Sequence, residues 1–205
     1  AVLDVLVAEE NDTTQIQQIE NFISQRVDVI LIVAHNAAAL SSVIEKAHAA
    51  GIKVIAYDRM IAQADIDAYI SFDSEKVGKY AAEYVMKAVP ENIAPVNVAY
   101  VGGSETDNNA LLVKKGAMSV LEPLIANGKA KVVFDQATLD WKPDQAYKNL
   151  KTFLDAGGKV DAVVAANDGT AFGAIQALKE HGLAGKVPVS GQDAELPAIK
   201  RLVEG

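Results

Sequence analysis

The sequence predicts an α/β fold built from two doubly wound lobes, in which each parallel sheet is covered by helices on both faces. Short apolar runs rich in valine and isoleucine alternate with patterns of helical period along the whole chain. Half of the 205 residues are apolar, which is enough to bury a substantial core. Such alternation is typical of parallel strands joined by right-handed helical crossovers.

The first part of the chain is expected to alternate as β-α-β-α-β. The run Val2–Val7 predicts a strand, and Thr13 or Thr14 is expected to cap the helix that follows. Gly51 suits the left-handed position after a helix at about 37–50. The strands on either side of that helix are expected at 27–33 and 52–57.

The same alternation continues to the end of the sequence. Strands are expected at 68–73, 96–101, 130–135, 160–165 and 187–190. Helices are expected at about 75–89, 109–121, 144–156, 170–182 and 194–204. The strand near 67–73 is weak and has a polar exit that can absorb a hinge rotation. We therefore expect a partial N-terminal lobe at 1–72 and a C-terminal lobe at 73–205.

Composition excludes several classes of function. The net charge is −8 and the lysines and arginines form no basic stripe, so we do not expect a nucleic-acid partner. No apolar run has the length of a membrane span, and cysteine is absent. The three histidines have no metal-ligand spacing, and no nucleophile elbow or phosphate-binding loop is present. We expect neither an enzyme nor a bound metal or cofactor.

Polar side chains follow several of the expected strands, at the edge where an open parallel sheet binds its ligands. Asp58 and Arg59 come directly after 52–57, and the alternative for them is a surface ion pair with each other. Asn109 stands at the start of a helix, where we assign the cap to Asp107 or Asn108 and leave Asn109 for ligand.

The later strands end in a similar way. Asn167 and Asp193 each follow a buried strand, and we assign the cap of the helix after 160–165 to Asp168. Trp141, the only tryptophan, lies in a loop after a strand, which favours a ligand platform over a core position. Asp, Asn and Arg side chains suit a polyhydroxylated ligand, because each hydroxyl group both donates and accepts a hydrogen bond.

Five segments, with the motifs Tyr-Asp-Arg-Met-Ile and Gly-Gln-Asp-Ala among them, lie in consistent order over nearly the whole chain. They are 56–61, 69–73, 102–110, 161–168 and 190–195. Together they resemble the D-xylose-binding branch of the type I periplasmic sugar-binding family. The resemblance implies that Asp58, Arg59, Asn109, Asn167 and Asp193 bind hydroxyl groups and that Trp141 stacks on a pyranose.

The resemblance also implies a function and a location. It implies a periplasmic protein, or an extracellular one anchored to a Gram-positive cell, that binds D-xylose or a related sugar between two closing lobes. An ABC transporter permease is then the expected partner. The alternatives are a sensor that signals to a membrane histidine kinase and the effector domain of a sugar-responsive repressor. Compared with the family, the sequence is expected to lack the first strand-helix unit and the C-terminal return.

Overall fold

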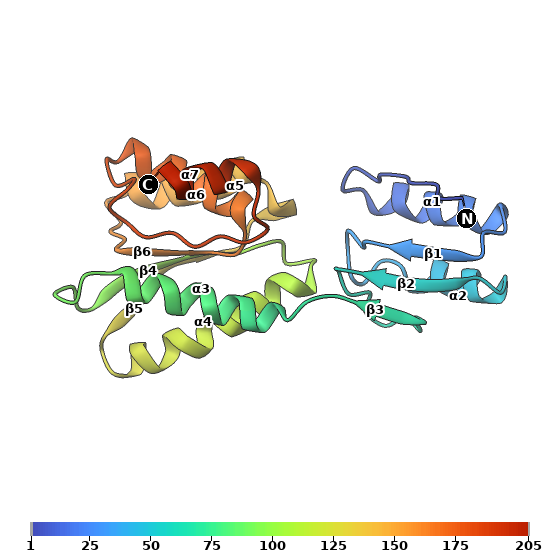
Figure 1. Ribbon diagram of the computed structural model, residues 1–205, viewed down its shortest axis with the longest axis horizontal. Coiled ribbons are helices and arrows are strands. Elements are labelled where there is room, and N and C mark those ends of the chain that lie inside the picture. The colour runs from blue at the N-terminus through green and yellow to red at the C-terminus, as the bar shows by residue number, and fades with distance from the viewer. Residues whose placement is uncertain (1, 205) are drawn as a thin grey trace. The chain divides into compact units, whose positions relative to one another are not determined.

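The computed structural model describes residues 2–204, which divide into two compact units (Figure 1). Unit 1 contains the residues up to Phe72 together with Thr106–Asn109. Unit 2 contains Asp73–Glu105 and the residues from Ala110 onward. Each unit has its own parallel sheet, so the expected α/β class is confirmed.

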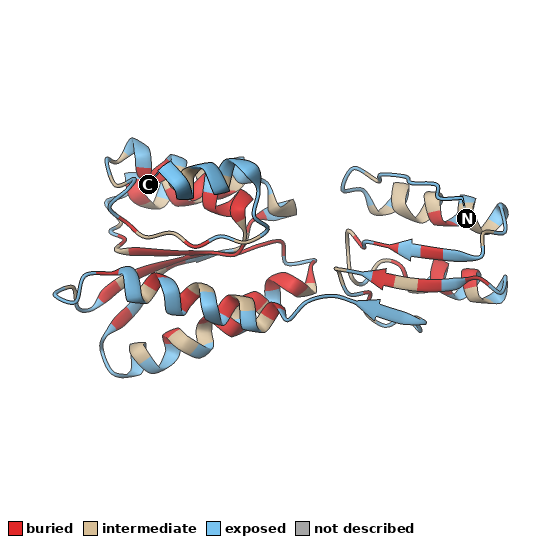
Figure 2. Ribbon diagram, viewed as in Figure 1, coloured by how far each residue is buried: buried red, intermediate tan, exposed pale blue. Residues whose placement is uncertain are grey.

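Unit 1 is a three-stranded sheet in the order β1-β2-β3 with two helices. All strand pairs are parallel, and Val29 is in register with Lys53 and Ile55 with Ala68. Residues of β1 alternate between exposed and buried (Figure 2). The buried ones pack with both helices in one core. The elements are α1 (Asp12–Ser24), β1 (Val29–Ile32), α2 (Ser41–Ala49), β2 (Lys53–Tyr57) and β3 (Ala68–Ile70).

Two expectations for unit 1 are wrong. Val2–Val7 forms no strand, because an extended segment becomes a strand only when a neighbour pairs with its backbone, and none of the described strands does so. The first helix is capped by Asn11, whose side chain accepts a hydrogen bond from the N–H of Thr14, and not by Thr13 or Thr14. Gly51 does take the left-handed conformation after α2, with φ of 77°.

Unit 2 has a parallel sheet in the order β5-β4-β6, with β4 in the centre. Helices cover both faces. The side chains of Ala99 and Val101 pack on one face with α5 and α6, and those of Val98 and Tyr100 pack on the other with α3 and α4. The elements are α3 (Ser74–Ala88), β4 (Val96–Val101), α4 (Asn108–Ala126), β5 (Ala130–Gln136), a 3-10 turn η1 (Leu139–Trp141), α5 (Pro143–Asp155), β6 (Ala162–Ala165), α6 (Asp168–Glu180) and α7 (Leu196–Glu204). The first two residues of α4, Asn108 and Asn109, belong to unit 1.

The strand expected at 187–190 is reduced to a single bridge between Val163 and Val189. The N–H of Val163 donates to the carbonyl of Pro188, and the N–H of Ser190 donates to the carbonyl of Val163. Pro188 has no N–H to extend the ladder. Within residues 2–204, no helix combines the length and the apolar character needed to cross a bilayer.

Candidate functional site

In unit 1 the end of β2 forms a tight turn at Asp58. Asp58 is left-handed, with φ of 60°, and the N–H of Arg59 donates to the carbonyl of Tyr57 at 2.7 Å. This hydrogen bond closes a γ-turn of three residues, a conformation that is strained for a residue with a side chain. The N–H of Asp58 donates to the carbonyl of Ile70 at 2.7 Å, which ties the turn to β3.

The start of α4 meets this turn. The Asn109 amide nitrogen lies 3.2 Å from the carbonyl oxygen of Asp58 and 3.3 Å from its Oδ1. Arg59 Nε lies 3.0 Å from Asp107 Oδ2, and the Asp107 side chain is only 2% exposed. Arg59 therefore pairs with Asp107, and the alternative of an ion pair between Asp58 and Arg59 is wrong. Asp107 also accepts a hydrogen bond from the Asn109 N–H, as expected for a helix cap.

Asp58 is a weaker acid than an exposed aspartate. Burial raises the pKa of its carboxyl group, and the nearby carboxylate of Asp107 raises this pKa further. The charge of Arg59 and the hydrogen bond from Asn109 oppose the increase. Unit 1 therefore presents two carboxylates, a guanidinium group and an amide within one small cluster.

In unit 2, Trp141 is held in a strained loop. Asp140 and Trp141 are both left-handed, with φ of 52° and 58°. The N–H of Trp141 donates to the carbonyl of Thr138, and the N–H of Thr138 donates to the carbonyl of Gly103 at the end of β4. The six-membered ring of the indole lies against Gly103, where it leaves no space for a Cβ atom. The ring is partly exposed, as a platform for a flat ligand requires.

The helix cap after β6 is Asn167, and the assignment of this cap to Asp168 is wrong. Asn167 Oδ1 accepts the N–H of Thr170 at 2.8 Å, and the Thr170 hydroxyl completes a reciprocal capping box. Helix α6 then begins at Asp168. The cap uses only the amide oxygen of Asn167, and its amide nitrogen lies 3.3 Å from Oδ2 of Asp193.

Asp168 instead binds a neighbouring segment. Its side chain is buried, and its Oδ2 accepts the N–H of Glu195 at 2.8 Å. Gly191 packs against Oδ1 so closely that a Cβ atom would overlap it. Asp168 thus holds the segment 191–195, in which Asp193 has a φ of 94°. A carboxylate directly after a strand can cap the next helix or bind a neighbouring segment. Here the contact with segment 191–195 shows which of these two roles Asp168 has.

The structure thus forms two separate groups from the predicted residues. Asp58, Arg59 and Asn109 lie together in unit 1, and Asn167 and Asp193 lie together in unit 2. The sequence did not indicate the Arg59–Asp107 pair or the role of Gly103. The doubled glycine at the end of β4 was the available signal, because a glycine there allows another group to approach the backbone.

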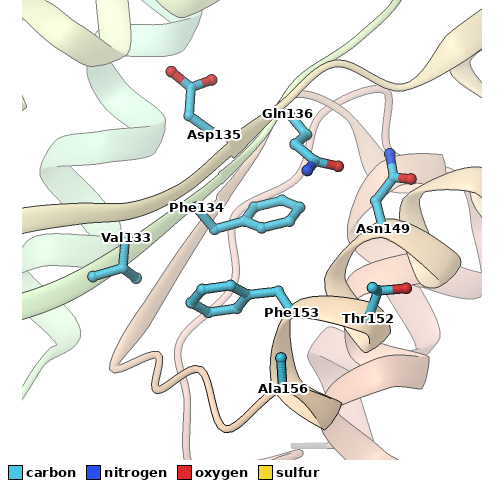
Figure 3. Close-up of a pocket in the computed structure, with 8 residues that line it drawn as sticks. All are labelled: Val133, Phe134, Asp135, Gln136, Asn149, Thr152, Phe153 and Ala156. Carbon is cyan, nitrogen blue, oxygen red and sulfur yellow. The ribbon is translucent and has the colours of Figure 1, made fainter.

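A pocket lined by residues of β5, α5 and its C-cap Ala156 lies elsewhere in unit 2 (Figure 3). Phe134 and Phe153 are among its lining residues and form a tilted pair, with ring centroids 5.5 Å apart. None of the predicted site residues lines it. No cluster of three or more His, Cys, Asp or Glu side chains among residues 2–204 is arranged to bind a metal ion.

Comparison with known proteins agrees with the resemblance seen in the sequence. A family model for the periplasmic binding protein domain matches residues 2–205. The chain is 52% identical to the D-xylose-binding periplasmic protein of Haemophilus influenzae and 51% identical to that of Escherichia coli, in each case over 97% of this chain. It spans 59% of the length of each of these relatives.

A solved structure has the same fold. An ABC transporter solute-binding protein from Clostridium phytofermentans, with β-D-glucose bound, superposes with a TM-score of 0.89 at 32% identity. The match covers 98% of this chain and 66% of that one.

Proposed function

Because the chain belongs to the family of periplasmic binding proteins, we propose that its protein binds a monosaccharide, D-xylose above all, and delivers it to an ABC transporter permease. The observation that carries this proposal is the 52% identity over 97% of the chain to a D-xylose-binding periplasmic protein. By the same argument we propose a periplasmic location. The protein is then a binding protein and not an enzyme.

In this proposal unit 1 supplies charged and amide partners for sugar hydroxyls. A guanidinium group carries five N–H donors in a fixed fork, so Arg59 can keep its bond to Asp107 and still donate to two adjacent hydroxyls. Asn109 and Asp58 add an amide and a carboxyl group beside it. Hydrogen bonds that involve a charged group contribute about 1.5–3 kcal/mol each.

Unit 2 supplies a flat face and a second polar pair. The indole of Trp141 suits the C–H face of a pyranose, and the loop that carries it is strained, as binding loops often are. Asn167 and Asp193 lie within 3.3 Å of one another and offer a donor and an acceptor. We propose that the sets in the two units each offer contacts to hydroxyl groups or to the C–H face of a sugar.

Calorimetry on the full-length protein tests the proposal, with D-xylose, D-glucose, D-ribose and L-arabinose as ligands. We expect micromolar binding of xylose, which corresponds to about −8 kcal/mol, and weaker binding of the other sugars. Asn109→Ala should weaken binding at least tenfold. Asn127→Ala, in the exposed turn after α4, and Thr152→Val, in the pocket of Figure 3, should bind as the wild type does. The absence of heat with all four sugars would overturn the proposal.

A further inference from the structure

We propose that the hydroxyl groups of Tyr69 and Ser71 are positioning groups that hold the Asp58 turn in its binding conformation. The inference rests on the proposed function, because the turn carries two of the residues proposed to bind the sugar, Asp58 and Arg59. Tyr69 and Ser71 are not among the residues proposed to bind it.

Three donors converge on one backbone oxygen. The carbonyl of Asp58 accepts hydrogen bonds from the Tyr69 hydroxyl at 3.0 Å, from the Ser71 hydroxyl at 2.8 Å and from the Asn109 amide at 3.2 Å. A carbonyl oxygen has two lone pairs, so three donors to a single one are more than the usual number. The peptide group after Asp58 is therefore fixed from two different segments of unit 1.

This peptide group needs external support. A φ of 60° is unfavourable for an aspartate, and a γ-turn whose central residue has positive φ is rare and strained. Such conformations persist only where the surroundings over-determine them. Here the Asp58 N–H donates to the carbonyl of Ile70 in β3, and three donors bind the Asp58 carbonyl.

The position of β3 explains why these two hydroxyls reach the turn. Tyr57 is in register with Ile70, so the residues around the turn lie beside Tyr69 and Ser71. Successive side chains of a strand point to opposite faces, which places residues 69 and 71 on the same face. Tyr69 is 39% exposed and Ser71 is also exposed, so neither contributes much to the core.

The turn determines where both proposed ligands point. Asp58 is the central residue of the turn, and Arg59 is the next residue, whose side chain extends to Asp107. A rotation of the peptide between them moves both side chains at once. Loss of the two hydroxyls is thus expected to reduce sugar affinity through both side chains.

The variants Tyr69→Phe, Ser71→Ala and their combination test this in the full-length protein. Each removes one neutral hydrogen bond, so we expect each to weaken D-xylose binding by about two- to tenfold and the pair by about ten- to a hundredfold. The matched controls are Tyr84→Phe on the exposed side of α3 and Ser24→Ala at the end of α1. Both controls should bind xylose with wild-type affinity.

An Asp58→Gly background separates positioning from a general structural effect. Glycine adopts positive φ without strain, so the turn can hold Arg59 without the two hydroxyls, and the Tyr69→Phe and Ser71→Ala changes should have a much smaller effect in this background. Equal effects in both backgrounds, or unchanged affinity in the wild-type background, would overturn the inference and leave the proposed function standing. If the wild-type protein binds none of the four sugars, the proposed function fails and the positioning role fails with it.

Discussion

The indole of Trp141 lies against Gly103, which has no space for a side chain beneath the ring. Gly103 follows the central strand β4, and Trp141 belongs to the turn after β5. The carbonyl of Gly103 also accepts the N–H of Thr138, which in turn accepts the N–H of Trp141 through its own carbonyl. Gly103 thus anchors the backbone of the Trp141 loop and also contacts its ring. The ring can lie this close to the backbone only because Gly103 has no Cβ atom.

Gly103→Ala should therefore push the ring outward. Overpacking of this kind costs about 1–3 kcal/mol, and we expect xylose affinity to fall at least tenfold. Calorimetry measures the affinity, and the emission spectrum of Trp141 reports the displacement. Phenylalanine has a smaller ring than tryptophan and leaves more space for the alanine Cβ atom. Trp141→Phe should therefore restore part of the stability lost in Gly103→Ala. If Gly103→Ala binds xylose normally, the ring is not the platform.

Arg59 has a structural partner as well as a proposed ligand. Asp107 is almost fully buried, so Arg59→Ala leaves its carboxylate without the guanidinium group and should destabilise unit 1 by about 1–3 kcal/mol. We also expect it to weaken xylose binding by two or more decades. Arg59→Lys separates the two effects, because lysine keeps the charge but not the fork. The Arg59→Lys protein should recover most of the stability, but calorimetry should show that it binds xylose at least tenfold more weakly than the wild type.

Asn167 and Asp168 should respond to substitution in different ways. Asn167→Ala removes a helix cap, which costs about 0.5–2 kcal/mol, and also removes a proposed ligand. Asp168→Asn preserves the shape of the side chain but weakens the acceptor for the Glu195 N–H, so it should loosen the segment that carries Asp193. Protease sensitivity near residues 191–195 measures this loosening. It should rise clearly in Asp168→Asn and less in Asn167→Ala, which removes only the longer contact with Asp193.

The fold was largely predictable because parallel strands buried on both faces have a distinctive pattern. β4 was expected at 96–101 and lies there, since its residues are almost all buried. Val2–Val7 has the same apolar character, but a strand also needs a paired neighbour. The local apolar pattern does not show whether such a neighbour is present. Pro188 was a visible warning that the strand at 187–190 would be short.

The candidate site was predictable only in the types of its residues. Strand ends indicated Asp58, Arg59 and Asn167, because ligand groups gather at that edge of a sheet. Their partners depend on contacts between distant segments, such as Arg59 with Asp107 or Asp168 with the N–H of Glu195. Two adjacent polar residues at a helix start satisfy the same local rule, so the choice between Asn167 and Asp168 as the cap required the backbone geometry.

The carboxylate of Asp67 connects the segment before β3 to the start of β2. It lies 2.7 Å from Lys53 Nζ and 3.0 Å from His48 Nε2, and it accepts the N–H of Val54 at 2.8 Å. The hydrogen bond from Lys53 is the main reason that the pKa of Asp67 lies well below its usual range, and the Val54 N–H adds to the effect. The same pair raises the pKa of Lys53.

This cluster predicts an acid-sensitive unit 1. A carboxyl group whose pKa is lower in the folded state stabilises the fold above its unfolded pKa of about 4, and this contribution is lost as the pH falls toward the folded value. Asp67→Asn should therefore lower the thermal unfolding midpoint at pH 7, and the difference from wild type should shrink steadily below pH 4. The exposed Asp28→Asn serves as the control and should follow the wild-type curve. A constant difference from pH 7 to pH 2 would show that Asp67 acts through shape and not through its charge.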